Sequence, residues 1–166
     1  YPYEKTSHAV SVIETNKEEY VWQTQNFVKP DSRDLVIYEL LIRDFSFRSD
    51  YQTVIDSLPH LKKLGVNAIE LMPIIEFDGL LSWGYAPTFF FAAEKFYGPE
   101  ESLKALIDSC HSNGIAVILD IVFNHAFQPN PWLRLYYHKG RDEPTQQSPW
   151  FNVEATHPFN VGYDFN

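Results

Sequence analysis

The stretch IAVILDIVFNH occupies residues 115–125. As far as Phe123 it is apolar apart from Asp120, and such a run is typical of a strand that is covered on both faces in a parallel sheet. LVIYELLI at residues 35–42 and AIELM at residues 68–72 are runs of the same kind. We therefore expect three buried strands.

Helical patterns separate these strands. Asp50 is a candidate N-cap for a helix whose apolar residues recur every three or four positions and which stops at Gly65. Pro59 lies inside this helix and is expected to kink or split it. A second helix opens at Pro99 and ends before Gly114. Strand and helix alternate, which predicts an α/β fold with parallel pairing.

The remaining segments define the expected domain organisation. Residues 1–34 are interpreted as a lead-in from an upstream region, and residues 35–125 as the first β/α units. Residues 126–166 are polar, aromatic and rich in proline, so they are interpreted as a long excursion. Residues 74–97 are expected to form an aromatic loop. Because the chain starts with Tyr1 rather than Met, we interpret it as an excised fragment.

Composition excludes several classes of function. The net charge is -9, with 22 acidic and 13 basic residues, so a nucleic-acid-binding surface is not expected. No apolar stretch approaches the roughly 18–20 residues that span a membrane. The single cysteine, Cys110, cannot form an internal disulfide. This favours a cytoplasmic location but is compatible with export, so the compartment stays open.

Polar side chains cluster where the third strand is expected to end. Ligands bind at the carboxyl ends of parallel strands, and Asp120, Asn124 and His125 could hold hydroxyl groups or a metal ion there. The structural alternative is a buried Asp120 that caps a neighbouring loop. In the aromatic loop, Trp83 and Tyr85 could stack on the apolar face of a sugar. The alternative is a packed aromatic loop without a ligand.

Five stretches together resemble one family. The motif DIVFNH resembles the first signature of the α-amylase family, glycoside hydrolase family 13, which has an Asp, a short apolar stretch, and then Asn and His. Four further stretches resemble the family's first strand, its first helix and second strand, the following loop, and part of the excursion after the third strand. In order along the chain, the five are VIYELLIRDF (36–45), LKKLGVNAIELMPI (61–74), WGYAPTFFFAAEKFYG (83–98), DIVFNH (120–125) and HPFNVGYDFN (157–166).

This resemblance implies a partial (β/α)8 TIM barrel with about the first three strands and the start of the excursion called domain B. It also implies a role for each motif residue. Tyr85, His125 and Trp83 would bind substrate, with Tyr85 stacking on the sugar and His125 donating a hydrogen bond to it. Asp120 and Asn124 would support the site, and Asn124 is a possible calcium ligand; no other cofactor is implied.

The resemblance implies an α-amylase-family glycosidase acting on starch, glycogen or maltooligosaccharides. Branching, debranching or neopullulanase-like enzymes are the favoured relatives. The catalytic carboxylates follow later strands in this family, so no catalytic residue is expected within this fragment, which is predicted to be inactive alone. Its open strand edges predict self-association.

Two alternatives remain open. The first is a non-catalytic amylase-like scaffold or carbohydrate-binding module. The second is a metal-dependent hydrolase that uses Asp120, His125 and His111, although the paired histidine spacing of such sites is absent.

Overall fold

The computed structural model describes residues 15, 17–79, 81–158 and 161–166. Contacts divide the chain into two compact units. The first unit combines the described residues up to Met72 with Lys95–Asp120, and the second combines Pro73–Glu94 with Ile121–Asn166.

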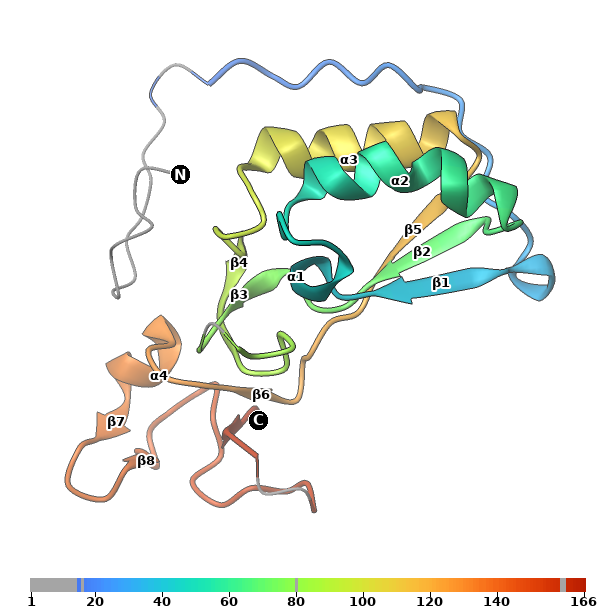
Figure 1. Cartoon of the computed structure of the whole chain (residues 1–166). Helices are drawn as coiled ribbons and strands as arrows, with labels where there is room; N and C mark the ends of the chain where they lie inside the picture. Colours follow the sequence, from blue (N-terminus) through green and yellow to red (C-terminus); the bar gives the residue numbers. More distant parts are fainter. Residues whose placement is uncertain (1–14, 16, 80, 159–160) are drawn as a thin grey trace. The chain divides into compact units, whose positions relative to one another are not determined.

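A parallel sheet forms the centre of the first unit (Figure 1). Its strand order is β1 (Ile37–Leu40), β2 (Ala68–Leu71) and β5 (Ala116–Leu119). Residue Ile37 pairs with Ala68, and Ala68 pairs with Ala116. The central strand β2 is the best covered, because it has a neighbour on each side. The expected alternation of three parallel strands with helices is therefore confirmed.

Two long helices, α2 (Tyr51–Lys63) and α3 (Glu100–Ser112), lie side by side on one face of this sheet (Figure 1). The predicted cap of α2 is confirmed, since the Asp50 carboxylate accepts a hydrogen bond from the Thr53 N–H at 2.8 Å. The helix continues through Pro59, so the proline does not split it. Pro59 lies on the exposed side of α2, while buried residues on the other side hold the helix against the core: Tyr51, Val54, Leu58 and Leu61.

The segment before β1 is bound to α3. Both oxygens of the Asp108 carboxylate accept main-chain hydrogen bonds, from Gln23 N–H and Thr24 N–H, each at 2.8 Å. Further along, Phe27 stacks on His111 with ring centroids 4.1 Å apart. The described part of the predicted lead-in therefore packs as a strap along the outside of the first unit. Two short elements flank β1: η1 (Ser32–Asp34) and α1 (Ile42–Phe45).

The second unit consists of short antiparallel pairs and one short helix. Its small core is formed by Ala126, Leu133 and Phe151, with five partly buried aromatic side chains packed around them. The elements are β3 (Ile75–Phe77) paired with β4 (Pro87–Ala93), β6 (His125–Ala126) paired with β9 (Tyr163–Asp164), β7 (Tyr137–His138) paired with β8 (Glu143–Pro144), and α4 (Pro131–Leu135).

Several expectations about individual elements are wrong. The first and third strands are shorter than expected, and the residues after β1 turn into α1. Neither β1 nor β5 is covered on both faces: Ile37 is 47% exposed and Leu119 is 45% exposed, because both strands are edges of the described sheet. Asp120 follows the end of β5 rather than lying within a strand, and it is half-buried rather than buried. Residues 74–97 are not a loop throughout, because β3 and β4 form a hairpin within them.

Among the described residues, none of the helices combines the length and the apolar character needed to cross a membrane.

Candidate functional site

His125 is the most constrained of the predicted site residues. It lies on β6, opposite Asp164 of β9, and its side chain is 6% exposed. Its ring atom Nε2 lies 2.9 Å from the main-chain carbonyl oxygen of Tyr85. A carbonyl can only accept a hydrogen bond, so Nε2 carries the hydrogen and donates it. The ring therefore connects β6, which begins at the last residue of the DIVFNH motif, to the aromatic loop.

The other ring nitrogen of His125, Nδ1, has no hydrogen-bond partner among the described residues. Nδ1 is shielded from solvent and makes no hydrogen bond within the described part of the chain. With the hydrogen on Nε2, a neutral ring leaves Nδ1 as an unpaired acceptor, and a buried unpaired polar atom costs about 1–3 kcal/mol. Such atoms are rare in folded proteins and often have a functional explanation. This one marks His125 as a candidate ligand-binding group.

The loop between β3 and β4 carries the predicted aromatic residues. Trp83 is 61% exposed and Tyr85 is 38% exposed, whereas Gly84 between them is buried. The φ angle of Gly84 is +93°, and a Cβ there would lie 2.5 Å from the main-chain oxygen of Pro73. Only glycine fits this position. The close packing of Gly84 holds the loop in place while both flanking rings reach the surface.

Asn124 is exposed, and its main-chain oxygen accepts a hydrogen bond from Phe165 N–H at 3.0 Å. Asp120 belongs to the first unit, where its N–H donates to the Leu71 carbonyl at 3.0 Å as an extension of the β2–β5 pairing. Tyr85, Trp83, Asn124 and His125 all belong to the second unit. The roles assigned to all five residues stay predictions.

Three residues beside His125 were not singled out from the sequence. The Asp164 carboxylate is buried, and its Oδ1 lies 3.2 Å from Nε2 of His157. Gly162 has a φ angle of +63°, and a Cβ there would lie 3.0 Å from the Cδ2 atom of His125. The signal that could have found two of them is the GYD triplet in the final motif, where a glycine precedes a short strand.

Four further acidic residues, Glu39, Glu70, Glu94 and Asp44, lie apart from this cluster in the sequence. Glu39 and Glu70 are register partners on β1 and β2, and both lie within strands rather than beyond their carboxyl ends. Glu94 is buried just after β4, and its N–H donates to the Ile74 carbonyl. Asp44 is exposed and pairs with Arg43. The expectation that this chain lacks the catalytic pair stays a prediction.

A metal site finds little support in the described residues. No three of their His, Cys, Asp and Glu side chains form a group that could hold a metal ion. The metal-hydrolase alternative with Asp120, His111 and His125 needs such a group and has no support there. Calcium prefers oxygen ligands, of which Asn124 could supply one.

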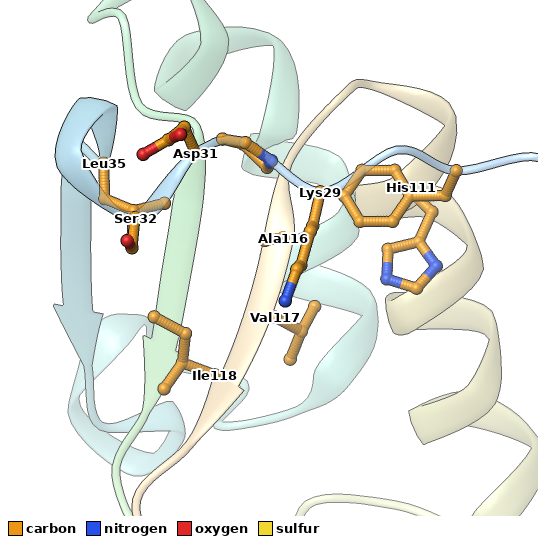
Figure 2. A pocket seen from close by; sticks show the side chains of 10 residues that line it. Lys29, Asp31, Ser32, Leu35, His111, Ala116, Val117 and Ile118 are labelled. Atoms are coloured by element: carbon orange, nitrogen blue, oxygen red, sulfur yellow. The ribbon is translucent and has the colours of Figure 1, made fainter.

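A separate cavity of about 640 Å³ lies in the first unit (Figure 2). It is bordered by the strap before β1, the end of α3 and strand β5, with Lys29 and His111 among its lining residues. Of the residues proposed for the metal-hydrolase alternative it contains only His111, and it contains none of the five residues proposed for sugar binding. Its β5 residues, Ala116 to Ile118, begin at the amino end of the strand, whereas ligands of parallel α/β folds bind beyond the carboxyl ends. We therefore do not consider it the primary site.

Comparison with known proteins identifies the class. The family model of the α-amylase catalytic domain matches residues 13–166. The chain belongs to the α-amylase family, and it forms part of the (β/α)8 TIM barrel of that family's catalytic domain. The resemblance inferred from the five sequence stretches is confirmed.

Three relatives illustrate the range of similar proteins. The malto-oligosyltrehalose trehalohydrolase of Saccharolobus solfataricus is 34% identical, and the match covers 89% of this chain and 24% of that protein. The 1,4-alpha-glucan-branching enzyme of Emericella nidulans is 41% identical, covering 66% of this chain and 16% of that protein. A crystal structure of a candidate alpha amylase from Salmonella typhimurium is 31% identical with a TM-score of 0.69, covering 88% of this chain and 23% of that chain. The chain thus spans about a quarter or less of the length of these relatives.

Proposed function

We propose that the protein carrying this chain is a glycoside hydrolase or transglycosidase that acts on α-glucans, and that this chain supplies part of its sugar-binding site. Membership of the α-amylase family supports the class of reaction. The names of the relatives, a trehalohydrolase and an α-glucan-branching enzyme, support the class of substrate. The observation that carries the proposal is the contact between His125 Nε2 and the Tyr85 carbonyl, because it brings a sugar-binding type of side chain to the exposed aromatic loop.

The proposed roles follow from the chemistry of the side chains. Tyr85 and Trp83 offer flat apolar faces to the C–H groups of a pyranose ring, and their exposure leaves room for it. The unpaired Nδ1 of His125 is the ring atom left to accept a hydrogen bond from a sugar hydroxyl, and because Nδ1 is shielded from solvent, the side chains around it are proposed to move when the sugar binds. Asp120 and Asn124 are proposed to support the site rather than to contact the sugar.

Bond cleavage is proposed to need residues outside this chain. Retaining glycoside hydrolysis requires two carboxyl groups about 5–5.5 Å apart, one as nucleophile and one as acid and base. No such pair is assigned among residues 1–166. The 166-residue chain alone is therefore expected to bind weakly and to release no sugar.

The test compares binding and turnover in the intact protein. We expect reducing ends or transferred branches to appear from maltoheptaose or glycogen, and we expect no product with the isolated chain. Trp83→Ala should raise the dissociation constant for maltoheptaose about fivefold, since one stacking contact contributes on the order of 1 kcal/mol. Trp22→Ala is the control, because Trp22 is 37% exposed but lies in the strap of the first unit.

The outcomes separate the remaining functions. Binding without turnover by the intact protein would favour the non-catalytic scaffold or carbohydrate-binding module. Product release by the isolated chain would contradict the absence of catalytic carboxylates. Equal effects of the two tryptophan substitutions would contradict the assignment of the loop.

We further propose that any calcium ion is held in part by the side-chain oxygen of Asn124. The described residues provide no three-residue group of acidic or histidine ligands around it, so other oxygen ligands would be required. Elemental analysis of the purified protein checks this. If calcium is present, Asn124→Leu should lower its occupancy, and full occupancy in that variant would rule Asn124 out.

A further inference from the structure

Asp164 is the centre of a hydrogen-bond network in the second unit. Its side chain is 4% exposed. The carboxylate accepts hydrogen bonds from the Asn152 amide at 2.8 Å and from the Thr156 N–H and hydroxyl, both at 3.0 Å. Nε2 of His157 also lies 3.2 Å from Oδ1 of Asp164. One carboxylate thus joins β9 to a segment that is otherwise without helix or strand.

The charge on Asp164 is stabilised by these donors. Burial by itself raises the pKa of Asp164, but the hydrogen bonds from Thr156 and Asn152 and the nearby His157 outweigh it, so the pKa lies below its ordinary value. The carboxylate is therefore ionised at neutral pH. Because three hydrogen bonds from the described residues reach the carboxylate, its oxygens are already used within the protein.

The main chain of Asp164 lies directly against the strand of His125. The two residues are register partners in the β6–β9 pair, and Phe165 N–H donates to the Asn124 carbonyl on the same edge. The Asp164 carbonyl accepts a hydrogen bond from Asn152 N–H at 3.0 Å. Both the side chain and the main chain of Asp164 therefore hold β9 in place beside β6.

The ring of His125 is enclosed by the same segment. The backbone of Gly162 approaches its Cδ2 edge, and the His157 ring centroid lies 6.4 Å from its own. Phe127 packs against it edge to face, with centroids 5.5 Å apart. Of these three neighbours, His157 belongs to the 152–157 segment and Gly162 directly precedes β9. A shift of that segment would free the ring to rotate away from the Tyr85 carbonyl.

We propose that Asp164 is a positioning residue for His125. By fixing β9 and the 152–157 segment, the ionised Asp164 holds the His125 ring in the orientation that donates from Nε2 to Tyr85 and leaves Nδ1 unpaired. The inference rests on the proposed sugar-binding function for its significance, but its structural part can be tested without substrate.

The test is Asp164→Asn in the intact protein, with Glu154→Gln as the matched control. Glu154 is an exposed acid in the same segment, so its substitution removes one negative charge without touching the network. Two readouts are needed: the ¹⁵N signals of the His125 ring, which report which nitrogen carries the hydrogen, and the dissociation constant for maltoheptaose. A purely structural role would lower the unfolding midpoint without changing the ring signals.

We expect wild type and Glu154→Gln to show hydrogen on Nε2 of His125. In Asp164→Asn this signature should weaken, and the dissociation constant should rise about tenfold, the effect of losing one hydrogen bond. Unchanged ring signals in a folded Asp164→Asn protein would overturn the inference, whatever happens to binding. If that variant does not fold, Thr156→Val is measured instead, because it removes the hydroxyl that donates to Asp164 and keeps the side-chain shape. The same change in the His125 ring signals is expected, and unchanged signals would overturn the inference.

The two proposals fail in different ways. If the wild-type protein does not bind maltoheptaose, the proposed function is wrong. The ¹⁵N signals of the His125 ring would still test the positioning role of Asp164. If the wild type binds maltoheptaose and Asp164→Asn changes neither the dissociation constant nor the His125 ring signals, only the positioning role is wrong.

Discussion

Gly84 illustrates how a single residue fixes the aromatic loop. Alanine at this position would adopt an unfavourable positive φ angle and would also place its Cβ 2.8 Å from the Cβ of Pro73. The two penalties together are expected to lower the free energy of unfolding by about 2–4 kcal/mol for Gly84→Ala. Urea unfolding of the variant and the wild type measures this.

Gly79 in the same loop provides the control. Its φ angle is +81°, but a Cβ there would meet no atom within 4 Å. Gly79→Ala should therefore cost only the backbone penalty of about 1–2 kcal/mol. A Gly84→Ala protein as stable as Gly79→Ala would show that the approach to Pro73 is not tight.

Cys110 is fully buried on α3, and burial raises the pKa of its thiol to about 12. In the unfolded chain the thiol ionises near pH 8.5. Its contribution to stability is therefore complete below that pH and is lost as the pH rises toward 12. Cys110→Ala should show a smaller loss of stability between pH 8.5 and 10.5 than the wild type, measured as the urea midpoint. A steeper loss in the variant would contradict the raised pKa.

At the scale of single residues the sequence singles out Trp83, Tyr85 and His125 because each belongs to a short motif, and their roles stay predictions. Asp164 is not singled out, because its neighbours come from Asn152 and Thr156, and nothing in local spacing predicts that these segments meet.

Among the elements, the strap before β1 offers the clearest test. Asp108→Asn leaves one carbonyl oxygen where the carboxylate accepts from both Gln23 N–H and Thr24 N–H. We expect hydrogen exchange of these two amides to accelerate by about tenfold or more, as local opening becomes easier. Exchange within α3 should change little. Nuclear magnetic resonance or mass spectrometry can follow both regions.

Glu101→Gln is the matched control, because Glu101 is an exposed acid in the first turn of the same helix. It should leave the exchange of the strap unchanged. Equal acceleration in both variants would mean that helix charge, rather than the Asp108 contacts, determines how tightly the strap is held.

Long periodic elements were predictable and short paired ones were not. The helices α2 and α3 have apolar stripes, a cap or an initiating proline, and a terminal glycine signal, all of which are local. The two-residue strands β6 and β9 have no period to detect, since their pairing joins His125 to Asp164 across the chain. Strand β4 was missed because its aromatic residues and flanking glycines suggested a loop.

For the molecule as a whole, exposed apolar side chains on the edge strands predict self-association of the isolated chain. Ile37 on β1 is 47% exposed and Leu119 on β5 is 45% exposed. Open edges of this kind pair readily with other chains. Sedimentation of the 166-residue chain should reveal species larger than a monomer, and Ile37→Lys should shift the distribution toward the monomer.

Val28→Lys is the control, because Val28 is 86% exposed but lies outside the strands. It should leave the distribution unchanged. A wild-type chain that sediments only as a monomer at tens of micromolar, a concentration at which exposed edges commonly associate, would contradict the prediction.

The two units are interleaved along the chain, since residues 73–94 of one precede residues 95–120 of the other. Translation at about 5–20 residues per second delivers the β3–β4 hairpin seconds before its partners after residue 120 emerge. During this interval the nascent hairpin exposes aromatic side chains that later pack in the second unit.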